Sequence, residues 1–206
     1  LLASLGINLF WGTSSKLDAV LTFAWCLGSV LEIAATVWVV SRWLKGANDG
    51  GIQWATFTPV FFIPVVGNVL AHLGGVSIGL EAWATAQFGV GVFLWVVLQT
   101  LMFVRMAQAG PLPARMAPTW FITMVPPSLM GLSLLQLDAP LTLAWMMWGI
   151  GAFFLCLSLT QVQTVREQPF SMAYWSMSFP LGAFTSLTLR MSQAHGGAWL
   201  ELPATL

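Results

Sequence analysis

The chain is dominated by apolar segments that are longer than the hydrocarbon core of a lipid bilayer is thick. Hydrophobic residues make up 58% of the 206 residues and charged residues only 7%. A helix of about 20 apolar residues crosses a bilayer, whereas a soluble domain needs a polar surface that this composition cannot supply. We therefore predict an all-α, polytopic membrane protein whose surroundings are the lipid bilayer.

We expect six complete membrane spans. In chain order they cover Ala19–Leu44, Trp54–Leu73, Leu80–Ala107, Met116–Leu135, Pro140–Val165 and Phe170–Met191. Shorter apolar stretches at 1–10 and 198–206 are typical of partial spans. The sequence thus predicts a single transmembrane domain over 1–206, an internal fragment truncated at both ends.

Every second span contains proline well away from its ends. The central prolines of these spans are Pro64, Pro126, Pro127 and Pro180. An interior proline removes a backbone hydrogen bond and bends a helix. In lipid such a break persists only where protein or a water-filled cavity surrounds it. The sequence therefore predicts kinked helices on the inside of a ring, each paired in a hairpin with a straight helix on the outside.

Basic residues near the span ends predict the orientation of these hairpins. Lys16 and Arg190 fall on one side of the membrane, and the larger group falls on the other: Arg42, Lys45, Arg105, Arg115 and Arg166. The positive-inside rule places the loops of the larger group in the cytoplasm. The hairpins then share one orientation and recur roughly every 60 residues, which favours parallel repeats around an axis along the membrane normal.

Several classes of function lack support in the sequence. The formal net charge of zero gives a nucleic-acid partner no electrostatic basis. Cys26 and Cys156 lie in apolar spans and predict neither a disulfide framework nor a metal site. No carboxylate pair or Ser/His/Asp arrangement predicts a catalytic constellation, and His72 and His195 cannot supply the facing pairs of a membrane cofactor enzyme. We expect no catalytic residue, no metal and no cofactor.

A few polar residues within the spans have two interpretations each. Glu32 lies near the middle of a straight span, where an ionisable group is a candidate for proton coupling; the alternative is a protonated side chain hydrogen-bonded between helices. Asn68 and His72 share a face of a kinked helix and either line a pore or pack. Arg190 either attracts anions to a pore mouth or anchors the helix at the interface.

Three proline-containing stretches carry a resemblance to a known family. Residues 168–180 read QPFSMAYWSMSFP, residues 63–68 read IPVVGN, and residues 125–129 read VPPSL. They resemble the tellurite-resistance/dicarboxylate transporter family, which includes bacterial TehA, the malic-acid permeases and the plant guard-cell slow anion channels. The resemblance extends over nearly the whole chain, from the end of the family's third helix through its ninth.

This resemblance implies ten helices in five hairpins around a central pore, assembled as a homotrimer in the plasma membrane, which is the inner membrane of bacteria. It also implies that Phe179 is the pore gate, because the residue matches the phenylalanine that plugs the pore of the channel members. Without the resemblance, Phe179 is either a hydrophobic constriction or a packing residue. The expected function is transport of an inorganic anion, a C4-dicarboxylate or an oxyanion. A non-transporting membrane sensor or scaffold on the same fold is the alternative.

Overall fold

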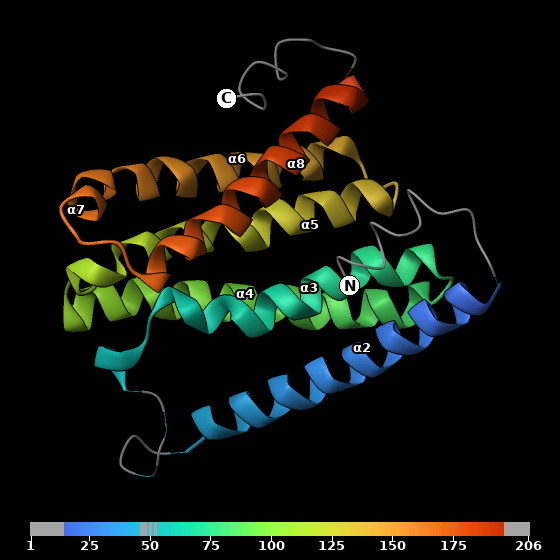
Figure 1. The fold of residues 1–206 in the computed structure, drawn as a ribbon, viewed down its shortest axis with the longest axis horizontal. Coiled ribbons are helices and arrows are strands. Elements are labelled where there is room, and N and C mark those ends of the chain that lie inside the picture. The colour runs from blue at the N-terminus through green and yellow to red at the C-terminus, as the bar shows by residue number, and fades with distance from the viewer. Residues whose placement is uncertain (1–14, 46–48, 50, 52, 196–206) are drawn as a thin grey trace. The chain divides into compact units, whose positions relative to one another are not determined.

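The computed structural model describes residues 15–45, 49, 51 and 53–195, which form helices and no strands (Figure 1). This confirms the all-α prediction; the partial spans predicted at 1–10 and 198–206 lie outside the described residues. The α-helices are α2 (Ser15–Trp43), α3 (Ile63–Ser77), α4 (Glu81–Ala109), α5 (Val125–Gln136), α6 (Leu141–Leu159), α7 (Val162–Arg166) and α8 (Ser178–His195). The 3₁₀ helices are η2 (Trp54–Thr56), η3 (Pro59–Phe62), η4 (Ala114–Met124) and η5 (Met172–Met177).

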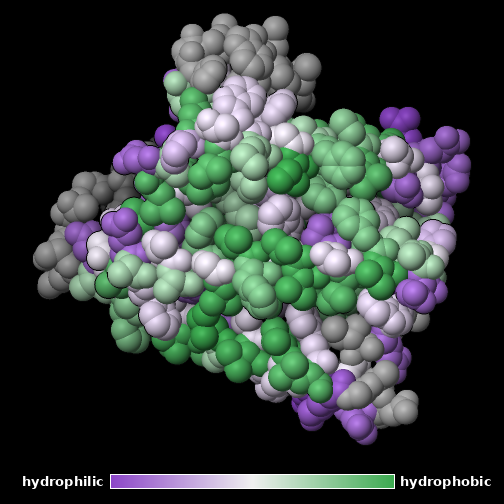
Figure 2. Space-filling view, turned by 180° about the vertical axis from the view of Figure 1, so that it is seen from behind, coloured by the Kyte–Doolittle hydropathy of each residue, from purple (hydrophilic) through white to green (hydrophobic). Residues whose placement is uncertain are grey.

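Four helices in the described part of the chain are long and apolar enough to cross a membrane. They cover Asp18–Trp43, Pro59–Ser77, Glu81–Ala109 and Leu141–Leu159. Apolar side chains also dominate the surface seen in Figure 2. These features agree with a polytopic membrane protein. The spans predicted over Met116–Leu135 and Phe170–Met191 are not among the four, and they stay predictions.

The described chain divides into two compact units. The first contains the residues up to Gln53 together with 63–94, and the second contains 54–62 together with the residues from Trp95 onward. The first unit therefore holds α2, α3 and the beginning of α4. The second holds the end of α4 and all the helices that follow it.

A close approach of three helices forms the core of the first unit. Trp25 of α2, Ala71 of α3 and Ala84 of α4 are buried together, and the Trp25 indole N–H donates a 3.1 Å hydrogen bond to the Ala71 carbonyl. A Cβ atom on Gly75 would lie 2.5 Å from both the Ala84 Cβ and the Trp25 ring. Glycine is therefore required here, because small residues let membrane helices come into contact.

In the second unit, α5 packs against both α6 and α8, and α8 crosses them obliquely in Figure 1. Ala144 of α6 and Leu187 and Met191 of α8 form one buried cluster. The Trp148 indole N–H donates to the Thr188 hydroxyl at 3.0 Å, which joins α6 to α8. These contacts fix α8, the helix that carries the predicted gate.

One predicted straight span is divided in the structure. We expected a helix over Pro140–Val165, but α6 ends at Leu159 and α7 begins only at Val162. The Gln161 amide donates to the Ser158 carbonyl, three residues back, so the α-helical pattern is interrupted there. A short tight turn at a helix end needs no proline or glycine, and no such residue is present at this break to reveal it in the sequence.

Candidate functional site

Each predicted proline break coincides with a change of helix type. The α-helices α3, α5 and α8 each follow a 3₁₀ helix without interruption. Pro64 is the second residue of α3, Pro126 and Pro127 are the second and third of α5, and Pro180 is the third of α8. The first turn of an α-helix needs no backbone N–H. The prolines therefore begin α-helices, rather than interrupting α-helices that have already formed.

Phe179 lies on an exposed face of α8. Its side chain is 37% exposed, whereas the adjacent Pro180 is buried. At about 100° per residue, Ser186 and Arg190 fall within about 40° of Phe179 around the helix axis, and both are also exposed. One face of α8 thus presents an aromatic ring, a hydroxyl group and a guanidinium group in a row.

Local hydrogen bonds hold the segment before Phe179. The Tyr174 hydroxyl of η5 lies 2.6 Å from the Val165 carbonyl of α7 and 2.9 Å from the Gln168 carbonyl, so it can donate to either. The Tyr174 ring also packs on Phe170, with 5.3 Å between ring centroids. These contacts attach the first half of the motif over residues 168–180 to the end of α7.

Asn68 and His72 are fully buried in the first unit. The Asn68 amide donates to the Thr36 hydroxyl of α2 at 2.7 Å and to the Pro64 carbonyl at 2.7 Å. The His72 ring lies 5.2 Å from the Phe88 ring of α4, measured between centroids. The structure thus directs the Asn68 amide toward α2 and the His72 ring toward α4, and the pore-lining role of both residues stays a prediction.

Glu32 is half-buried on α2, and its carboxyl group lies against α3. A Cβ atom on Gly67 would clash with the Glu32 Oε1, so the carboxyl group lies directly against the backbone of Gly67. Gly67 comes three residues after Pro64. The Glu32 carboxyl group of α2, a helix without proline, therefore contacts α3 close to Pro64.

Helices α2, α3 and α4 of the first unit carry further polar residues that are hydrogen-bonded between helices. The Trp83 indole N–H donates to the Ser29 hydroxyl at 2.7 Å, and that hydroxyl donates to Gln87 Oε1 at 2.6 Å. We call Ser29, Glu32, Thr36, Asn68, His72 and Gln87 the α2–α4 polar cluster. The spacing of Ser29, Glu32 and Thr36 places them on one face of α2. This spacing is the feature of the sequence that could have predicted a polar face on α2.

Several buried polar atoms of this cluster are unpaired among the described residues. They are Asn68 Oδ1, Gln87 Nε2 and both ring nitrogens of His72. Buried polar groups normally have partners, so these atoms leave donors and acceptors available inside the unit. No group of three or more His, Cys, Asp or Glu residues that could hold a metal ion occurs in the described part of the chain.

Arg105 is not in a loop, although the charge pattern predicted it among the basic loop residues on the cytoplasmic side. It lies inside α4, is 2% exposed, and donates from Nη1 to the Gly110 carbonyl just beyond the helix end. A cation near a helix C-terminus stabilises the partial negative charge there. Arg105 therefore caps α4, and it does not contribute a free loop charge.

Comparison with known proteins decides what kind of protein carries these features. The model of the SLAC1 family, described as voltage-dependent anion channel, matches residues 1–205. The chain belongs to this family. The match confirms the relationship expected from the motif around Phe179, and the family consists of channels and transporters rather than enzymes.

Relatives from a plant and an archaeon match the chain at similar levels. The S-type anion channels SLAH2 and SLAH3 of Arabidopsis thaliana are 25% and 24% identical to it, over 77% and 82% of this chain. The uncharacterized transporter MJ0576 of Methanocaldococcus jannaschii is 25% identical over 89% of this chain. The chain spans 30%, 26% and 56% of the lengths of these three relatives.

Proposed function

We propose that the chain forms most of an anion pathway in which the proline-containing segments, each a 3₁₀ helix that leads into α3, α5 or α8, surround a central pore. The observation that carries the proposal is the exposed face of α8, where Phe179, Ser186 and Arg190 lie in a row. An exposed cation on a membrane helix is costly against lipid, whereas the Ser186 hydroxyl donates to the Gly182 carbonyl within α8. The exposed Arg190 therefore fits a water-filled passage lined by this face.

The proposed pore attracts anions with few formal charges. Helices α3, α5 and α8 all begin at a proline break, and the N-terminal end of a helix carries a partial positive charge. Discontinuous helices present such ends to anionic substrates in transporters. Because a weakly charged lining binds anions weakly, they can leave as readily as they enter. The substrate class is an inorganic anion, a C4-dicarboxylate or an oxyanion.

Phe179 is the proposed gate of this pore. An apolar ring in a narrow passage stops ions by occlusion and by excluding water. Replacing Phe179 with alanine in the full-length protein should raise anion flux several-fold in proteoliposomes. Phe93→Ala is the matched control, since Phe93 is an exposed phenylalanine on the proline-free helix α4. Equal flux in wild type and Phe179→Ala protein would contradict the gate.

Glu32 is the proposed proton-coupling residue if transport depends on protons. Its carboxyl group lies against Gly67 of the proposed pore helix α3, and the next residue in the chain, Asn68, has a buried Oδ1 with no hydrogen-bond partner among the described residues. In the Glu32→Gln variant, anion uptake should no longer vary with the pH gradient, although uptake itself continues. An unchanged pH dependence would leave Glu32 with a packing role only.

The proposed assembly is a homotrimer in the plasma membrane, with one pore in each subunit. The loops with Arg42 and Lys45, with Arg115 near the end of α4, and with Arg166 are proposed to face the cytoplasm. The match to a family of membrane channels supports the membrane location. In this arrangement Arg190 lies at the outer mouth of the pore, where a cation raises the local anion concentration.

A further inference from the structure

Helices α4 and α6 border an open groove in the second unit. The groove has a volume of about 550 Å³, within the range of about 300–1,000 Å³ that is typical of ligand pockets. Its lining includes Trp95, Gln99 and Phe103 of α4 and Gly149, Phe153 and Phe154 of α6. None of the described residues that line the groove is charged, so the groove suits an uncharged molecule with a large apolar part.

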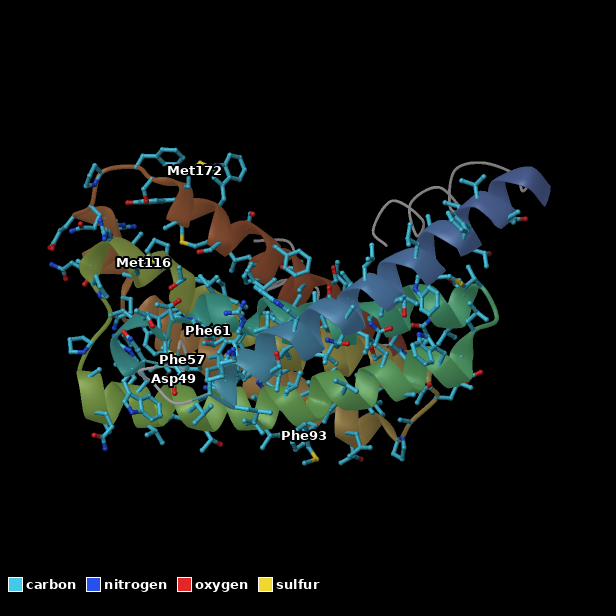
Figure 3. The ribbon with its side chains drawn as sticks, turned by 90° about the horizontal axis from the view of Figure 1, so that it is seen from below. Asp49, Phe57, Phe61, Phe93, Met116 and Met172 are labelled. Atoms are coloured by element: carbon cyan, nitrogen blue, oxygen red, sulfur yellow. The ribbon has the colours of Figure 1, made fainter. Side chains whose placement is uncertain are left out.

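The groove opens on an exposed apolar side of α4. Phe93 and Val96 are exposed on this helix, and Figure 3 shows Phe93 pointing away from it. Phe103 follows Val96 by seven residues, or about two turns, and therefore lies on the same side of α4. Phe103 and Phe153, on the two borders of the groove, are exposed as well. A molecule dissolved in the bilayer therefore reaches the groove from the side.

Three buried polar atoms belong to the lining of the groove, at the middle of a membrane span. Trp95 is the central residue of the span Glu81–Ala109, and Gln99 follows it by one turn, about 6 Å along the helix. The Trp95 Nε1 and the Gln99 Nε2 and Oε1 have no hydrogen-bond partner among the described residues, and Gln99 is only 9% exposed. Unpaired polar groups are costly in the hydrocarbon region, where no water is available to them.

The three atoms together define the chemistry of the partner that they lack. Trp95 Nε1 and Gln99 Nε2 are hydrogen-bond donors, and Gln99 Oε1 is an acceptor. A protonated carboxyl group matches this set, because its hydroxyl group donates to Oε1 while its carbonyl oxygen accepts from both N–H groups. An ester has the carbonyl oxygen but no donor, and the single oxygen of an alcohol cannot pair with both ends of the amide. Burial in an apolar environment also favours the neutral form of a carboxyl group.

We propose that the groove between α4 and α6 binds a fatty acid in its neutral form. The carboxyl group forms paired hydrogen bonds with the Gln99 amide and accepts a third from Trp95, and the hydrocarbon chain lies along Phe103 and Phe153. The site uses two proline-free helices and not the exposed face of α8. It therefore does not depend on the transport proposal.

The test uses the full-length protein in phosphatidylcholine vesicles and a hexadecanoic acid that carries a photoreactive diazirine on its chain. Cross-links located by peptide mass spectrometry should fall within residues 95–103 and 146–154. Unlabelled hexadecanoic acid should compete roughly tenfold better than methyl hexadecanoate or hexadecanol, because each of these analogues leaves a polar atom of the site unpaired. Equal competition by the acid and either analogue would overturn the proposal, and so would labelling confined to other residues.

Two variants test the polar contacts separately. Gln99→Leu should remove the preference for the acid over the ester without lowering the thermal midpoint of the lipid-free protein, because an apolar side chain replaces an unpaired amide. Trp95→Phe should weaken competition by the acid and by the ester alike, roughly fivefold, since it removes a donor to the carbonyl oxygen that both molecules share. A Gln99→Leu protein that still prefers the acid would overturn the proposal.

A third variant tests the groove itself. A Cβ atom on Gly149 would meet nothing within 4 Å, so Gly149→Leu fills the groove without a clash and should abolish the labelling. Gly89→Leu is the matched control, because Gly89 is equally open but does not line this groove, and it should be labelled as wild type is. Unchanged labelling of Gly149→Leu would overturn the proposal, and a change in its oligomer mass would then identify the groove as a subunit interface.

Discussion

Gly75 and Gly89 are both glycines within membrane helices, yet their surroundings differ. At Gly75 a methyl group would meet the Ala84 Cβ and the Trp25 ring, both at 2.5 Å, and the Trp25 ring is held by its hydrogen bond to Ala71. At Gly89 a methyl group would meet nothing within 4 Å. At the scale of single residues, the absence of a side chain is therefore required at Gly75 but not at Gly89.

This difference gives a direct prediction for two glycine-to-alanine changes. Gly75→Ala should destabilise the protein by about 1–3 kcal/mol, because overpacking forces the helices apart. Gly89→Ala should be neutral or stabilising by up to about 1 kcal/mol, since alanine favours a helix over glycine. Thermal unfolding of both variants in detergent measures the two effects. Equal midpoints for the two variants would contradict the packing of α2, α3 and α4 described above.

At the scale of helices, the three proline-containing segments share one construction. A 3₁₀ helix leads directly into an α-helix, and proline occupies the first turn of the α-helix in α3, α5 and α8. A 3₁₀ stretch within a longer helical segment often marks a hinge. In the third segment, Tyr174 links the 3₁₀ helix η5 to α7 through the Val165 carbonyl, so the residues just before Phe179 are held from outside their own helix.

Removing that link should loosen η5 without unfolding the protein. Tyr174→Phe deletes one hydrogen bond, worth about 1 kcal/mol, and the amides of residues 172–177 should then exchange hydrogen roughly fivefold faster. Ser176→Ala is the control, because the Ser176 hydroxyl donates only to the Ala173 carbonyl in the same turn. Exchange that is equally slow in wild type and Tyr174→Phe protein would show that the hydroxyl does not hold η5.

At the scale of the whole molecule, the proposed orientation in the membrane rests on the basic residues near the ends of the spans, and one of these residues is buried in the structure. Arg105 is buried and caps α4, so it no longer counts among the loop charges. Arg42, Lys45, Arg115 and Arg166 remain on the proposed cytoplasmic side, against Lys16 and Arg190 on the other. The bias persists with four residues against two, and the positive-inside rule still gives the same orientation.

Cysteine labelling tests this orientation. In a variant without Cys26 and Cys156, single cysteines at Lys45 and Arg166 should react with a membrane-impermeant maleimide only after the cytoplasmic side is exposed. A cysteine at Asp138, in the turn between α5 and α6, should react in intact cells. The reverse pattern would place α8 with its Arg190 end in the cytoplasm and would contradict the proposed outer mouth.

Some of the candidate site could be predicted because its signals are local. The motif ending in Phe179 and Pro180 identified the family, which the match over residues 1–205 confirmed. The direction of a side chain around its helix is not a local property, since it depends on which neighbouring helix it meets. Asn68 was expected at a pore or in packing, and its partner proved to be Thr36, 32 residues earlier.

The sequence alone determined that this is an all-α membrane protein of an anion-channel family. Those properties follow from the length of the apolar segments, the scarcity of charge and one short motif, none of which needs distant contacts. Only the tertiary structure decided that the prolines start α-helices, that Arg105 caps α4, and that Glu32 rests on Gly67. The physical reason differs between them. The contact of Glu32 with Gly67 depends on two helices that are far apart in the chain, whereas the start of each α-helix and the Arg105 cap depend on local backbone geometry that the residue pattern alone does not determine.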